Sequence, residues 1–456
     1  MTSHNLSVKI HVVSEMRIIM TCKKSIIAPI AILWSVIATS TMAKAVPGAL
    51  SAESNYICDC SYSLYCTNNS GISTSSAAYG VLNDVRINNA GGGPDYVRPG
   101  EASMGAIGLT AAAAHLSGAD QTRANDVLGA YFRTWVRSGQ AQASSGAIYQ
   151  SVSYTSNGAF SSASNPNPAA TGQMISAMWK YYKYTNDSTW LNDAAAFAIV
   201  KKAANFLVSN FNSTYNLEYS GGSYWTVDSA YAVPGLLCAV QWAQATQQPA
   251  SVYSSWSTTA SLLQQGLASM KDPNWNMFFR FRDGRGNKSY GKPVMIDQTC
   301  FSPYETNALA PRGDAFAGAI SDSWTLGFNG SPLMTPYTSN SGDWRYFGTH
   351  LQSGNNNLSP GASLQLAKVE WKYGSATAVN RASLRYQWVY GTGYSNLWYG
   401  ASGLTESGVR NGIVDWRDMT NYNNAAASWQ RFIDTSAYML EVTLMIDNGV
   451  DTTYTP

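Results

Sequence analysis

The turn at residues 181–191 constrains the fold more than any other feature, because it joins two long stretches rich in alanine and aromatic residues. Looser versions of it lie near Asp120, Pro249 and Thr377. Asp187 marks the turn itself. The spacings from Asp120 to Asp187, from Asp187 to Pro249 and from Pro249 to Thr377 are 67, 62 and 128 residues, and the last is about twice 64. Such a repeat is typical of stacked or circularly arranged units, and a hairpin of two helices of roughly 15 to 20 residues fits within about 65 residues. Six hairpins would use most of the chain, which predicts an all-α, (α/α)6 toroid with long loops.

Helical periodicity places the hairpins along the chain. Three hairpins are predicted, each a helix followed by a second helix that runs back along it: a stretch beginning at Val97 with 122–136, then 169–182 with 188–211, and 227–245 with 252–270. Three further helices are predicted at 360–371, 379–390 and 425–445. Residues 274–291 are polar and basic, and we interpret them as a long loop or a small hairpin. The predicted catalytic domain spans residues 97–456.

Residues 1–45 have the pattern of a signal peptide. Arg17, Lys23 and Lys24 precede the apolar run 25–38, and small residues at 43–45 would form the cleavage site. The run is short for a membrane span, so no stable membrane insertion is expected, with a signal anchor as the alternative. The sequence therefore predicts a secreted, extracellular protein.

The charge balance argues against a polyanionic partner. Residues 1–45 hold five of the 29 basic residues and one of the 27 acidic ones, so the remainder has 24 basic and 26 acidic residues. A net charge of −2 gives no reason to expect binding to nucleic acid. Only 12% of residues are charged and 12% are aromatic, which suits a protein that binds poly- or oligosaccharides, most simply as a monomer.

Five cysteines lie beyond the predicted signal peptide, namely Cys58, Cys60, Cys66, Cys238 and Cys300. A disulfide from Cys60 or Cys58 to Cys66 is expected in an extracellular chain. Residues 46–96, rich in Ser, Gly and Asn, are predicted to form an extended lead-in strapped to the domain. Only two histidines lie in this part, neither at ligand spacing, so no metal or cofactor is expected. Glycosylation sequons occur at Asn68, Asn186, Asn212, Asn287, Asn329 and Asn357.

Two acidic residues open predicted helices: Glu101 in residues 98–108 and Asp228 in residues 224–234. These stretches resemble the general-acid segment and the Asp-x-Ala-Tyr-Ala segment of glycoside hydrolase family 8. The hairpin rhythm over 97–445 resembles the wider six-hairpin glycosidase-like superfamily, whose members are secreted carbohydrate-active enzymes. The resemblance implies a cleft at one rim of the toroid, near the N-termini of the inner helices. The chain departs from family 8 in the wider gap between the segments, the missing Asp-x-Asp doublet and the lack of a clear third acid.

Glycosidic cleavage needs one carboxyl group that keeps its proton and one that stays ionised. Glu101, among apolar neighbours, is predicted to be the acid with a raised pKa. Asp228 is predicted to be the ionised partner, because a helix N-terminus favours the charged form. Each could instead be a first-turn residue that only offsets the helix dipole.

Glu305 and Asp322 are further catalytic candidates, because each lies within two residues of an aromatic residue. A structural salt bridge is the alternative role for both. Three aromatic residues and one arginine beside the candidate acids are predicted to bind substrate. They are Tyr96, Trp225, Trp324 and Arg98.

The sequence thus predicts a secreted glycoside hydrolase that acts on a neutral glycan through two carboxyl groups. A polysaccharide lyase on the same toroid is one alternative, and it would need a Tyr or His base and a cation for a uronate. A secreted carbohydrate-binding protein without activity is the other.

Overall fold

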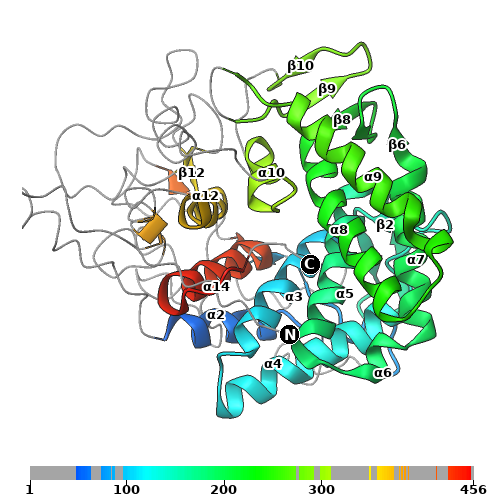
Figure 1. Cartoon of the computed structure of the whole chain (residues 1–456). Helices are drawn as coiled ribbons and strands as arrows, with labels where there is room; N and C mark the ends of the chain where they lie inside the picture. The colour runs from blue at the N-terminus through cyan, green and yellow to red at the C-terminus, as the bar shows by residue number, and fades with distance from the viewer. Residues whose placement is uncertain are drawn as a thin grey trace, which may run out of the picture. The chain divides into compact units, whose positions relative to one another are not determined.

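The computed structural model describes residues 48–62, 73–83, 85–87, 96–273, 277–291, 298–309, 349–350, 357–373, single helical residues between 379 and 389, 417–418 and 430–452. All belong to one compact unit, Ala43–Pro456, and the other unit, Met1–Met42, lies outside the described residues. The described part is mostly helical (Figure 1). None of its helices has the length and hydropathy of a membrane span.

Six described helices pack in a closed cycle. They are α3 (Pro99–Ala113), α5 (Pro168–Thr185), α8 (Thr226–Ala245), α10 (Ser302–Glu305), α12 (Pro360–Tyr373) and α14 (Ile433–Asn448). Each contacts the next, and α14 packs back against α3. A closed cycle of this kind is what the inner ring of an (α/α)6 toroid requires.

Further helices cover this cycle from outside. They are α2 (Ala49–Asp59), α4 (Gly118–Ala130), α6 (Ser188–Leu191), α7 (Ala194–Asn210) and α9 (Ala250–Ser269). Helix α7 packs against α5 and α8, α9 against α8, and α2 against α14 and α4. A π turn, Tyr131–Trp135, and a 3₁₀ turn, Val136–Ser138, extend α4. The predicted helical hairpins are therefore confirmed within the described residues.

Glycine lets the inner helices touch backbone to backbone. A Cβ atom on Gly172 of α5 would lie 2.1 Å from the carbonyl oxygen of Tyr231 in α8, and one on Gly235 would lie 2.6 Å from the Cα of Gly172. A Cβ on Gly108 of α3 would lie 2.6 Å from the Cα of Ala437 in α14. Any side chain at these positions would push neighbouring inner helices apart.

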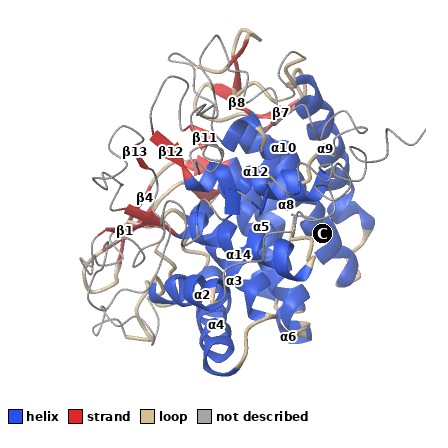
Figure 2. Ribbon diagram, turned by 90° about the vertical axis from the view of Figure 1, so that its left-hand side faces the viewer, coloured by secondary structure: helices blue, strands red, loops and turns tan. Residues whose placement is uncertain are grey.

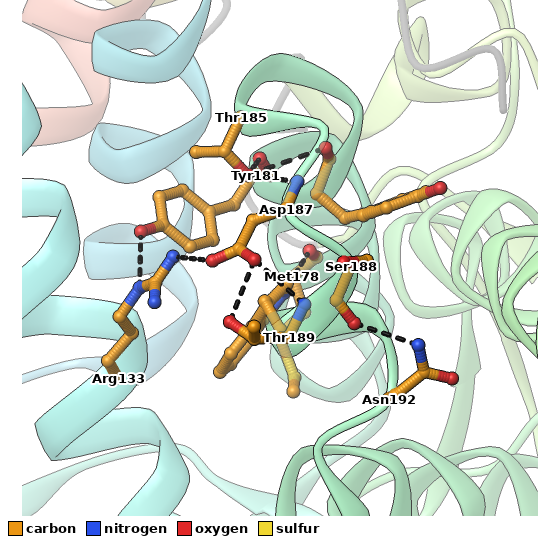
Figure 3. A network of polar contacts seen from close by, with 10 residues as sticks. Arg133, Met178, Tyr181, Thr185, Asp187, Ser188, Thr189 and Asn192 are labelled. Atoms are coloured by element: carbon orange, nitrogen blue, oxygen red, sulfur yellow. Dashed lines mark hydrogen bonds and ion pairs between the residues drawn. The ribbon is translucent and has the colours of Figure 1, made fainter.

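The turn at residues 181–191 holds the second hairpin to the first (Figure 3). Helix α5 ends at Thr185 and is followed by Asn186, whose φ of 49° is left-handed. Asp187 caps α6 by accepting a bond from the N–H of Thr189 at 2.8 Å. Arg133, in the π turn after α4, forms an ion pair with Asp187 and donates to the hydroxyl of Tyr181 at 3.0 Å. The turn is thus a point of attachment between hairpins, which explains its clear sequence pattern.

Short antiparallel sheets complete the described structure. Four are pairs: β1 (Val85–Ile87) with β14 (Gln430–Phe432), β2 (Ile148–Tyr149) with β5 (Pro166–Asn167), β3 (Val152–Tyr154) with β4 (Phe160–Ala163), and β6 (Phe211–Asn212) with β7 (Leu217–Glu218). Two are sheets of three strands: β9 (Phe281–Asp283) lies between β8 (Ser223–Trp225) and β10 (Lys288–Ser289), and β12 (Asn357–Ser359) lies between β11 (Thr349–His350) and β13 (Arg417–Asp418). Strands β5, β8, β12 and β14 run directly into α5, α8, α12 and α14. The strands therefore gather where inner helices begin (Figure 2).

Two predicted boundaries were wrong. Residues 46–96 are not wholly extended, because Ala49–Asp59 form α2, whose Tyr56 and Ile57 are fully buried in the core. The last predicted helix, 425–445, begins later, at Ile433, because residues 430–432 pair with β1. The small hairpin expected within 274–291 is present as β9 and β10.

The expected disulfide depends on Cys66, which lies outside the described residues, so that bridge stays a prediction. Cys58 and Cys238 are buried, and burial raises the pKa of each thiol to about 12. Both are therefore unreactive as thiolates near neutral pH.

Candidate active site

The first turns of several inner helices meet at one end of the cycle. A Cβ on Gly100, in the first turn of α3, would lie 3.2 Å from the Cα of Ala170 in the first turn of α5. The N–H of Ala169, one residue earlier, bonds to the carboxyl group of Asp228 in the first turn of α8. Glu101 and Asp228 thus lie at the same end of the molecule, on either side of the start of α5. We call this end, where α3, α5, α8 and α14 begin, the mouth.

Glu101 lies beside a second carboxyl group, that of Asp434 in the first turn of α14. The helices approach closely here, since a Cβ on Gly105, one turn after Glu101, would lie 2.6 Å from the side chain of Ile433. Glu101 and Asp434 share a hydrogen bond. On its other side, Oε1 of Glu101 lies 3.4 Å from Nη1 of Arg98, and the two side chains are 25% and 29% exposed.

The environment of Glu101 favours its protonated form. Burial is the largest cause and the neighbouring Asp434 carboxylate is the next, and together they raise the pKa of Glu101 from 4.5 to about 8, although Arg98 opposes the shift. Glu101 therefore keeps its proton at neutral pH while a quarter of its side chain is exposed. A general acid needs this combination.

Asp228 differs from the sequence prediction. Its residue is only 3% exposed, and burial raises the pKa of its carboxyl group from 3.8 to about 7, against the lowering effect of bonds from Ala169 and Ser220. The sequence analysis expected the helix N-terminus to favour the charged form of Asp228, but burial has the larger effect and raises its pKa. Glu218, fully buried nearby, has a pKa raised well above its usual value by burial and then by Asp228, and it accepts a bond from Asn210 at 2.8 Å.

Glu305 is not exposed at the mouth. It is fully buried, and Nζ of Lys368 lies 2.7 Å from its Oε1 and 2.6 Å from Oε2 of Glu441. Tyr231 donates to the other oxygen of Glu305 at 3.4 Å. The salt-bridge alternative describes Glu305 better than the catalytic one, because a side chain with no exposure cannot touch substrate in this conformation.

Tyr231 connects this buried network to the mouth. It lies three residues after Asp228 in α8, and its hydroxyl is 3.3 Å from that of Tyr438. Burial raises the pKa of Tyr231 well above its usual value, and Glu305, then Glu101 and Asp434, add to the shift. The network of Tyr231, Glu305, Lys368, Glu441 and Tyr438 therefore lies within electrostatic reach of the Glu101–Asp434 pair.

Of the predicted substrate-binding residues, Tyr96 is 52% exposed and lies two residues before Arg98. Trp225 ends β8, with its ring centroid 5.0 Å from that of Phe281 and the guanidinium of Arg280 5.0 Å from its ring. Asp322 and Trp324 lie outside the described residues.

One surface hollow of about 220 Å³ lies beside the turn at the far end of α5, away from the mouth. Its lining residues are Arg133, Arg137, Thr189, Trp190 and Asp193. Among the described residues, no group of three or more His, Cys, Asp or Glu could hold a metal ion.

Sequence reasoning missed Asp434 and Lys368. Asp434 is a first-turn acid like Glu101 and Asp228, but the predicted helix began eight residues too early and so placed it in the interior. Lys368 lies directly between the buried apolar residues Ala367 and Val369, and this pattern could have indicated a buried cation.

No protein-family model matches the sequence, and no curated protein is similar to it. Among solved structures, the chain is similar to a D-mannose isomerase (TM-score 0.56, 9% identity, covering 88% of this chain and 96% of that one). It is also similar to a protein described as a wild-type glycosidase (TM-score 0.55, 11% identity, 87% and 95%) and to an uncharacterized conserved protein from Thermus thermophilus (0.51, 11%, 82% and 96%). At this identity the likeness concerns the fold alone. It agrees with the predicted ring of helical hairpins.

Proposed function

We propose that this protein is a secreted glycoside hydrolase that cleaves a neutral poly- or oligosaccharide, with Glu101 as the general acid. One observation carries the proposal: Glu101 is accessible at the start of α3 and has its pKa raised to about 8. Departure of a sugar leaving group requires a proton donor in this state near neutral pH. The likeness in fold to a glycosidase supports the same class of reaction.

The ionised partner of Glu101 is Asp228 rather than Asp434. The two carboxyl groups of a glycosidase stand about 5 to 5.5 Å apart in retaining enzymes and about 6.5 to 9.5 Å apart in inverting ones, with substrate or water between them. Glu101 and Asp434 share a hydrogen bond and leave no such space. Asp434 therefore sets the proton affinity of Glu101, and Asp228 supplies negative charge from across the start of α5.

This assignment predicts a narrow pH dependence. Asp228 becomes ionised as pH rises through about 7, and Glu101 loses its proton as pH rises through about 8. A bell-shaped profile of kcat/KM with its maximum between these values is expected, because that parameter reports the essential acid and base of the free enzyme. A maximum near pH 4 to 5 would count against both roles.

The alternatives have less support in the described residues. A lyase needs a base such as Tyr, but the raised pKa of buried Tyr231 makes it a poor one, and Arg98 is paired with Glu101. Isomerisation is suggested only by the name of one similar structure.

Product analysis on the full chain separates these reactions. We expect new reducing ends from at least one member of a panel of xylan, β-1,4-glucan, β-1,3-glucan and mannan. The Asp187→Asn variant is a matched control, because it changes a carboxyl group at the far end of α5 and is expected to stay fully active. Unsaturated products absorbing in the near ultraviolet would indicate a lyase, and fructose formed from mannose an isomerase. Because a lyase also releases reducing ends, unsaturated products would overturn the proposal whether or not reducing ends appear, and so would fructose formed without new reducing ends.

A further inference from the structure

An exposed aromatic cluster flanks the mouth at the end of β7. Tyr219 is 45% exposed, and its ring centroid lies 5.3 Å from that of Tyr224, which in turn lies 4.9 Å from that of Tyr215. The guanidinium of Arg282 lies 4.8 Å from the ring of Tyr215. Tyr224 thus packs against Tyr219 and is itself in contact with Tyr215, while Tyr219 stays partly open to solvent.

The backbone that carries Tyr219 is held by a tight turn. Residues 220–223 form a tight turn, with Gly221 and Gly222 at φ values of 56° and 88° that few other residues adopt. Ser220 and Ser223 exchange backbone hydrogen bonds of 2.8 and 3.0 Å. The side-chain amide of Asn210 donates to the carbonyl oxygen of Tyr219 at 2.8 Å. An aromatic residue held in this way loses little conformational entropy when a ligand binds.

The cluster is tied directly to the candidate active site. Ser220, the residue after Tyr219, forms a side-chain hydrogen bond with the carboxyl group of Asp228. Because consecutive Cα atoms are about 3.8 Å apart, the backbone of Tyr219 lies one residue from a direct partner of that carboxyl group. Tyr224 lies two residues before the start of α8. A glycan bound at the mouth on the Asp228 side would therefore lie close to Tyr219.

We propose that Tyr219, supported by Tyr224 and Tyr215, is a stacking subsite for a pyranose unit on the Asp228 side of the mouth. The identity of the ligand rests on the proposed function. The surroundings fit a sugar, because the flat ring suits the C–H face of a pyranose and the adjoining turn carries the further hydroxyl group of Ser223. The adjoining turn residues are small and polar, so this is not a broad apolar patch of the kind that binds another protein.

Binding can be measured without catalysis in a Glu101→Gln background. Titration calorimetry with xylohexaose, cellohexaose, laminarihexaose and mannohexaose would identify the sugar that binds. Tyr219→Ala is expected to weaken its affinity about tenfold or more, a loss typical of one aromatic stacking contact. Tyr219→Phe keeps the ring and is expected to bind like the parent. Tyr184→Ala, at the far end of α5, is the matched control and is expected to have no effect.

The outcomes distinguish this inference from the proposed function. If Tyr219→Ala weakens binding while the natural sequence hydrolyses nothing, the subsite stands and the hydrolase proposal fails. Unchanged affinity in Tyr219→Ala, or no binding of any hexaose by the parent, overturns the subsite. Thermal unfolding of each variant shows whether a loss of affinity reflects a loss of fold. Tyr219→Phe changes the same turn position but keeps the ring, so it separates loss of the ring from disturbance of the turn.

Discussion

Replacing Glu101 with glutamine is expected to lower kcat by about 10²- to 10⁴-fold, the usual contribution of general acid catalysis. Glutamine keeps the size of the side chain and can still bond to Asp434, but it has no proton to donate. Because Glu101 lies in the first turn of α3 and is partly exposed, the substitution should leave the packing of the ring intact.

The measurement is release of reducing ends by purified variants at the pH optimum, with KM determined separately. Glu101→Asp serves as the conservative comparison and should retain part of the activity, since its proton donor remains but is one methylene group shorter. Asp187→Asn should behave like the natural sequence. Activity within about threefold of normal in Glu101→Gln would remove Glu101 from the mechanism, because general acid catalysis contributes far more.

Replacing Lys368 with methionine is expected to reduce the free energy of unfolding by about 3 to 5 kcal/mol, because it leaves charged groups buried without their partner. Lys368 and the carboxyl groups of Glu305 and Glu441 have no solvent exposure, and the methionine would leave the two acids facing each other. Total stabilities of about 5 to 15 kcal/mol make this a large loss.

Chemical denaturation of the full chain measures this effect. Lys201→Met is the matched control, because Lys201 is exposed on α7 and should change stability by less than about 0.5 kcal/mol. Glu305→Gln combined with Lys368→Met should recover part of the loss, since one of the opposed charges is then gone. Equal stability of Lys368→Met and Lys201→Met would show that the buried ion pairs do not hold the inner helices together.

Much of the fold could be predicted from the sequence, because the inner helices keep helical periodicity and the turn at Asp187 has a clear capping pattern. The sequence could not show that the cycle closes, since α10 has only four residues, too few for periodicity to be visible. It also missed α2, because this helix lies within a longer Ser-, Gly- and Asn-rich segment that resembles a loop, although Tyr56 and Ile57 are buried in the core.

The candidate site was predicted only in part. Glu101 and Asp228 are recognisable as acids that open helices, but their environments depend on neighbours distant in the sequence. Asp434 approaches Glu101 only because glycines let α3 and α14 pack closely. The degree of burial of Asp228, which decides its charge, is likewise a tertiary property. Periodicity in the sequence predicts where along a helix a carboxyl group lies. It does not predict how far the surrounding structure removes that group from water.

The pKa of Glu101 itself tests the central claim most directly. Difference infrared spectra between the natural sequence and Glu101→Gln report the protonated carboxyl group as pH changes, without any substrate. A midpoint at about 8 is expected, and Asp434→Asn should lower it, because the neighbouring negative charge is removed. Since the folded pKa lies above the ordinary 4.5, this group should also make the protein less stable as pH rises from 4.5 to about 8. A midpoint near 4.5 in the natural sequence would mean that Glu101 is ionised at neutral pH and cannot be the proton donor.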